Sequence, residues 1–144
     1  MPDSSLDPIR LVVRTAASPD VAWAHLTEPS HVREWLTAAS PVGAVGEPYV
    51  LDFGDGSIVQ GAIVSRDEGR MFAHRWAWLD QLPIVETQVT WTVRPVPGGG
   101  SEVELVHDGW AAAGADAATR ADHEHYWLGY LDALRERLED VAGS

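Results

Sequence analysis

The sequence contains no cysteine and no lysine, and these two absences exclude several kinds of chemistry. Without cysteine the chain has no disulfide, no thiol nucleophile and no cysteine-ligated zinc. Without lysine it forms no Schiff base on a lysine amine. The ten basic residues are all arginines and face 22 acidic residues, giving a formal net charge of −12. A surface of this charge repels phosphate, so we expect neither nucleic acid nor a membrane as a partner.

Long hydrophobic runs are also missing from the sequence. The first residues, MPDSSLDP, have no basic start and no apolar run, which argues against a signal peptide. No stretch reaches the roughly 18 consecutive apolar residues of a membrane span. We therefore expect a cytoplasmic protein with one domain over residues 1–144, an ordered core over about 8–142 and a flexible tail over 1–7.

Two short helices are predicted within residues 18–36, SPDVAWAHLTEPSHVREWL. Ser18 is a favourable N-cap, and Pro19 suits the first helical position. Pro29 ends the first helix and, together with Ser30, begins the second. This segment holds two of the seven tryptophans of the chain, and such large side chains often line cavities as well as cores.

The rest of the chain predicts an antiparallel sheet followed by one long helix. Alternating and β-branched residues separated by glycine- and proline-rich turns predict strands over 9–15, 49–53, 57–68, 71–79, 84–96 and 101–110. Residues 37–48 predict a loop. From Thr119 onward the pattern is helical, with an apolar stripe formed by Trp127, Leu131, Leu134, Leu138 and Val141. That stripe must pack on the sheet, which makes the fold class α+β.

The two-residue period of the strands predicts which side chains face the helix. The inward set comprises Phe72, His74, Trp76, Trp78, Thr87, Val89, Trp91, Val93, Val103, Leu105 and His107. A large aromatic sheet face covered by a single helix favours a cavity between the two. Apolar cavities with a few polar groups are the usual sites for small molecules.

Several segments, in their order along the chain, resemble a known family. SPDVAWAHLTEPSHVREWL, GAIVSRDE, FAHRWAW, VTWTVRPVPGGGSEVELVHDGW and YWLGYLDALRERLE are similar to the START-like (SRPBCC) superfamily. Within it, the chain resembles the branch named after the activator of the heat-shock-protein-90 ATPase, over about residues 9–141. The resemblance implies a helix-grip fold: a curved antiparallel sheet around a long C-terminal helix, with two short helices after the first strand. In this family the space between sheet and helix commonly holds a hydrophobic ligand.

Carried over position by position, the resemblance assigns family aromatic positions to Trp23, Trp35, Trp76 and Trp127, and a late-strand histidine to His107. The loop before the second strand departs from the family pattern. Many members have paired glycines there, whereas this chain has a single glycine followed by Glu47 and Pro48. We expect Trp23 to be a wedge between helices and sheet, and Trp35 to reach the mouth of the cavity.

The expected cavity residues are Trp35, Phe53, His74, Trp76, Trp78, Trp91, His107, Trp127 and Leu131. His74 and His107 have two interpretations: polar or acid–base groups toward a ligand, or buried histidines satisfied by neighbouring hydroxyls or carbonyls. His123 and His125 lie two residues apart and therefore on different helix faces, so we expect no metal site there. His125 is expected to face the sheet. No cofactor motif is present, so no cofactor is expected.

Three functions are compatible with these features. We favour a non-catalytic module that binds a small hydrophobic or aromatic molecule. The alternative is a cyclase/aromatase- or lyase-type enzyme that uses His74 and His107, which are weak candidates because no catalytic motif accompanies them. A chaperone-associated interaction module is the third hypothesis. A homodimer is compatible with each of the three functions.

Overall fold

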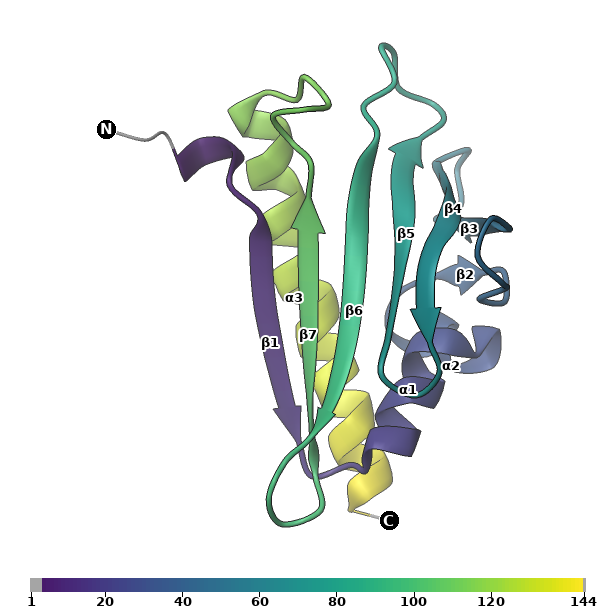
Figure 1. The fold of residues 1–144 in the computed structure, drawn as a ribbon, viewed down its shortest axis with the longest axis vertical. Coiled ribbons are helices and arrows are strands. Elements are labelled where there is room, and N and C mark those ends of the chain that lie inside the picture. Colours follow the sequence, from purple (N-terminus) through teal and green to yellow (C-terminus); the bar gives the residue numbers. More distant parts are fainter. Residues whose placement is uncertain (1–3, 144) are drawn as a thin grey trace.

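One antiparallel sheet and one long helix dominate the computed structural model, which describes residues 4–143 (Figure 1). The elements in chain order are the 3₁₀ helix η1 (Ser4–Leu6), β1 (Ile9–Thr15), α1 (Pro19–Thr27), α2 (Pro29–Trp35), β2 (Ala38–Ala39), β3 (Pro48–Asp52), β4 (Ile58–Asp67), β5 (Met71–Trp78), β6 (Thr87–Pro95), β7 (Ser101–Asp108) and α3 (Ala117–Ala142). Among the described residues, no helix has both the length and the hydrophobicity that a membrane crossing requires.

The seven strands lie in the order β1-β7-β6-β5-β4-β3-β2, and every neighbouring pair is antiparallel. The sheet curls around α3, which crosses one of its faces (Figure 1). The two short helices follow β1 and lie at the lower end of α3 in this view. This arrangement confirms the predicted helix-grip fold.

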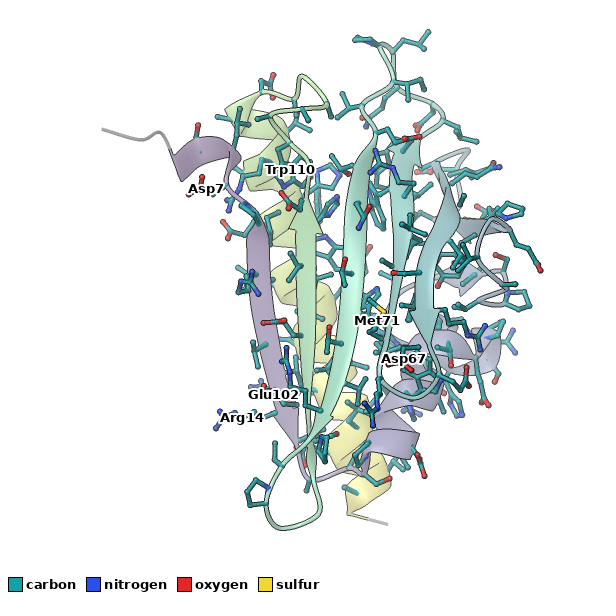
Figure 2. The ribbon with its side chains drawn as sticks, in the orientation of Figure 1. Asp7, Arg14, Asp67, Met71, Glu102 and Trp110 are labelled. Atoms are coloured by element: carbon teal, nitrogen blue, oxygen red, sulfur yellow. The ribbon has the colours of Figure 1, made fainter. Side chains whose placement is uncertain are left out.

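The inner face of the sheet is buried as the two-residue period predicts. On the β6–β7 pair, Trp91 lies opposite Leu105, and Val89 lies opposite His107. All four of these side chains are buried. The outer face instead carries charged pairs such as Arg14 with Glu102, whose atoms are 3.0 Å apart and which Figure 2 shows at the lower end of β1 and β7. Burial of the apolar side chains therefore decides which face of each strand is turned toward α3.

A single residue, Glu28, joins the two short helices. The Ser18 hydroxyl accepts a hydrogen bond from the Val21 backbone N–H and caps the start of α1. Glu28 donates its backbone N–H to Ala24 at the end of α1, and its carbonyl accepts from Val32 in α2. Because one residue serves both helices, the corner between α1 and α2 has no loop in which to bend.

Several details differ from the sequence-based expectation. Ala38–Ala39, in the expected loop, form the short strand β2 because they pair with Leu51 and Asp52 of β3. The sixth strand begins at Thr87 rather than at residue 84, because its pairing starts opposite Trp76, near the end of β5. Within the expected tail over 1–7, residues Ser4–Leu6 form η1, while residues 1–3 lie outside the described residues.

At Gly61, β4 lies too close to β5 to admit a side chain. A Cβ atom at this position would lie 2.0 Å from the Arg75 carbonyl oxygen, a distance that no side chain tolerates. The pairing of β4 with β5 also shifts between Ile63 and Ser65, which marks a bulge. Glycines and bulges bend strands locally, so this region contributes to the curl of the sheet around α3.

Candidate functional site

A cavity of about 460 Å³ lies between the end of β5 and the first half of α3. Its lining residues are Leu36, Phe53, Asp55, Ser57, Trp76, Trp78, Asp80, Gln81, Thr119, Asp122, His123, Tyr126, Trp127 and Tyr130. Its inner wall is aromatic, whereas several residues of its mouth are exposed. This is the size and character of a site for a small molecule.

His123 on α3 holds two tryptophan side chains of the aromatic wall in place. Its Nε2 accepts hydrogen bonds from the indole N–H groups of Trp78, at 2.9 Å, and Trp76, at 3.4 Å. Its Nδ1 lies 2.8 Å from the Thr119 carbonyl oxygen, so Nδ1 carries the proton and Nε2 the lone pair. The indoles are therefore held in place by a neutral imidazole, and their polar groups do not face the cavity unpaired.

Beneath this wall, His107 forms a second network that is fully buried. Its Nδ1 accepts from the indole N–H of Trp127 at 3.0 Å, so Nε2 carries the proton and donates to the Thr87 hydroxyl at 2.7 Å. The Trp110 indole donates to the His107 carbonyl at 3.0 Å, and its ring contacts His123 beside the first turns of α3 (Figure 2). Every polar atom of the His107 ring thus has a partner.

Burial decides the charge state of these histidines. It lowers the pKa of His107 well below the usual range, and the nearby His123 and His74 lower it further. Burial also lowers the pKa of His123, against a smaller opposing effect of its hydrogen bond to Thr119. Both imidazoles are therefore neutral near pH 7, as their hydrogen-bonding roles require.

His74 lies apart from the cavity. Its Nδ1 donates to the Arg75 carbonyl at 3.0 Å, and its ring packs against Tyr49 at 4.7 Å between centroids. Burial lowers its pKa to about 4. Of the two interpretations of the inward histidines, the contacts of His74 and His107 match that of buried groups satisfied by neighbours.

The structure brings four of the nine expected cavity residues onto the wall: Phe53, Trp76, Trp78 and Trp127. The other five, Trp35, His74, Trp91, His107 and Leu131, are buried and do not line it. Trp35 does not reach the mouth. Its indole donates to the His25 carbonyl at 2.7 Å and its ring meets Trp91 edge-on, whereas the next residue, Leu36, lines the cavity.

His123 is the main wall residue that the sequence-based expectation missed. The expectation for His125 was wrong, because its side chain is exposed and does not face the sheet. A signal for His123 was present in the sequence. Counting four residues back from Trp127 extends the buried stripe of α3 by one turn and reaches His123. Residues three apart on a helix also share a face, so Tyr130, three residues after Trp127, lies on the wall as well.

The mouth of the cavity is acidic. Asp55, Asp80 and Asp122 belong to its lining and are exposed, and no arginine is among the lining residues. The charge of the mouth thus has the same sign as the net charge of the chain, which is −12. Such a field disfavours the entry of anions.

Comparisons with known proteins agree with this geometry. The family model described as Activator of Hsp90 ATPase homolog 1-like protein matches residues 16–139. DynU16, a protein of the dynemicin biosynthetic locus, is 25% identical with a TM-score of 0.80; the match covers 95% of this chain and 48% of DynU16, so this chain spans about half of DynU16.

Two further solved structures share the fold. The Aha1 dimer from Colwellia psychrerythraea is 19% identical with a TM-score of 0.77, and the match covers 93% of this chain and 97% of that one. CalU16 from Micromonospora echinospora is 19% identical with a TM-score of 0.71, covering 94% and 83% respectively. A search of curated proteins finds no match.

Proposed function

This chain belongs to the family of Activator of Hsp90 ATPase homolog 1-like proteins, and from that premise we propose that it binds a small aromatic molecule in the cavity between β5 and α3. One observation carries the proposal. The indoles of Trp76 and Trp78 are both held by His123, so the aromatic wall is fixed before any ligand arrives. A preformed wall costs little ordering entropy on binding and offers ring faces for stacking.

The acidic mouth narrows the ligand class. Asp55, Asp80 and Asp122 favour a neutral or positively charged ligand over an anionic one. That DynU16 belongs to a biosynthetic locus is consistent with a small-molecule role for this fold.

The enzyme hypothesis has less support. His74 and His107 do not line the cavity, and a general acid or base must reach the proton that it transfers. His123 does line it, but its Nε2 already accepts from two indoles. We therefore place the cyclase- or lyase-type activity second to binding.

A chaperone-associated role rests on the family description alone, and pull-down of a chaperone from a bacterial lysate would be its first support. A homodimer also remains a proposal, which the dimer from Colwellia psychrerythraea supports by analogy. The mass of the purified chain in solution, measured by light scattering, distinguishes a dimer from a monomer.

Titration with N-phenyl-1-naphthylamine, a neutral aromatic fluorophore, tests the binding proposal. We expect saturable binding with quenching of tryptophan emission, because the wall contains three of the seven tryptophans. Phe53→Ala should weaken binding roughly 2- to 10-fold, since one aromatic contact contributes about 0.5–1.5 kcal/mol.

Leu128→Ala is the matched control for this titration. Leu128 lies on α3 as the wall residues do, but it is exposed and does not line the cavity. It should leave the Kd unchanged. A wild-type protein that does not bind the fluorophore, or a Phe53→Ala variant with the wild-type Kd, would contradict the proposal.

A further inference from the structure

The corner between α1 and α2 brings together three side chains that the cavity does not use. His25 comes from α1, and His31 and Glu34 come from α2. One nitrogen or oxygen atom from each of the three lies within 4.8 Å of the others. Two imidazoles and a carboxylate form a donor set that zinc and related divalent ions prefer.

His25 has an unused nitrogen. The side chain is 2% exposed, and its Nδ1 lies 2.9 Å from the Val21 carbonyl oxygen, so Nδ1 carries the proton and donates it there. Nε2 therefore holds a lone pair, and no group among the described residues gives it a hydrogen bond. Buried polar atoms without partners are rare and costly, so this atom calls for a physical explanation.

His31 and Glu34 complete the arrangement. His31 Nδ1 lies 2.8 Å from Glu34 Oε1, and His31 Nε2 lies 3.5 Å from Glu28 Oε2. When a metal ion binds Nδ1 of a neutral His31, the ring proton moves to Nε2 and faces Glu28. Each imidazole then binds the metal through one nitrogen and an oxygen acceptor through the other, the usual pattern around metal-bound histidines.

Arg137 of α3 holds the other oxygen of the same carboxylate, since its guanidinium donates to Glu34 Oε2. The other oxygen, Oε1, is thereby directed toward the histidines and lies 2.8 Å from His31 Nδ1. Arg137 thus orients the Glu34 carboxylate, and the negative charge of Glu34 compensates the positive charge of Arg137.

We propose that His25 Nε2, His31 Nδ1 and Glu34 Oε1 bind a divalent transition-metal ion of the zinc class, which ties α1 to α2. The two imidazole rings are stacked at 4.3 Å, so binding requires the His31 ring to turn out of the stack. Its side chain is 36% exposed and is free to do so. The ion then draws the three donors to about 2.0–2.2 Å.

Calorimetric titration of the chelator-treated chain with Zn²⁺ tests this site. We expect one Zn²⁺ to bind per chain. His31→Ala and Glu34→Gln should each weaken binding at least 10-fold. His125→Ala, which removes an exposed histidine of α3, should leave the Kd unchanged. Equal Kd values for wild type and His31→Ala, or equal loss in His125→Ala, would overturn the proposal.

A second measurement covers the buried member of the site without a mutation that threatens folding. Long-range ¹H–¹⁵N spectra of the wild-type chain report each imidazole nitrogen separately. One equivalent of Zn²⁺ should shift the resonances of His25 Nε2 and His31 Nδ1 and leave those of His125 in place. Zn²⁺ binding that leaves the His25 resonance unmoved would assign the ion elsewhere and refute the site.

Discussion

The two halves of α3 lie against the same sheet and pack in opposite ways. The first half presents His123, Trp127 and Tyr130 to the sheet and leaves a cavity of about 460 Å³. The second half presents Leu134 and Leu138, which are fully buried, and lines no part of that cavity. A separate hollow of about 400 Å³ lies between β1 and the residues Leu131, Asp132 and Arg135 of this half. We call them the open half, residues 119–130, and the closed half, residues 131–138.

The chemistry of the side chains explains the difference between the halves. Rings opposite the open half are held by directional hydrogen bonds, such as those from Trp76 and Trp78 of β5 to His123. Rigid rings do not collapse to fill a gap. Leucines carry no such constraint and interdigitate to high density. A polar network among aromatic rings therefore maintains this cavity, whereas Leu134 and Leu138 pack against the sheet with no exposed surface.

Truncation in the closed half should produce the largest effect. Leu134→Ala removes a fully buried side chain and should lower the free energy of unfolding by about 2–5 kcal/mol. Tyr130→Ala, in the open half and only partly buried, should cost about 1 kcal/mol or less. Urea unfolding of both variants measures the two losses. Equal losses would remove the distinction between the halves.

Acid should act on the histidines next. Unfolded histidine binds a proton near pH 6.5, whereas burial lowers the pKa of His74 to about 4 in the folded chain. The unfolded state then binds more protons as the pH falls through this window, so stability is lost on acidification, by about 2.5 kcal/mol between pH 7.5 and 4.5 for His74 alone. Denaturant midpoints from pH 7.5 to 4.5 measure the loss.

Two observations sharpen the acid prediction. His74→Phe lacks the titrating group, so its stability should fall less over the same pH range. Amide exchange should rise earlier in the open half, because His123 and His107 also have lowered pKa values and protonated Nε2 of His123 would face two indole N–H groups. Simultaneous loosening of both halves would contradict this order.

The smallest effect is expected from the imidazole that links the two indoles. His123→Leu removes the acceptor of Trp76 and Trp78 and should lower the free energy of unfolding by about 1–2 kcal/mol. It should also weaken binding of the neutral fluorophore. His125→Leu, on the exposed face of the same helix, should change stability by about 0.5 kcal/mol or less. Unchanged fluorophore binding in His123→Leu would show that the wall does not depend on this residue.

Most of the fold follows from the periodic spacing of apolar residues along each strand and along the long helix. The period of two in Phe72, His74 and Trp76 gave the buried face of β5, and the stripe from Trp127 to Leu138 gave the face of α3. β2 was missed because two alanines have no strand preference of their own, and only pairing with β3 makes them a strand.

The site was less predictable than the fold, because a lining residue and a core residue can share one strand face. Trp76 and His74 have the same orientation on β5, yet only Trp76 reaches the cavity. That depends on where α3 leaves the sheet uncovered, which no local pattern encodes. Likewise, the mouth is reached by Leu36 rather than Trp35, because the hydrogen bond to His25 turns the indole inward.

The shared acceptor at His123 has an optical consequence. Two of the seven indoles donate to one lone pair, at 2.9 and 3.4 Å, so their excited states experience the same imidazole. Any molecule that moves His123 changes the emission of Trp76 and Trp78 together. The protein therefore contains its own fluorescent reporter, placed in the wall of the cavity that it would report on.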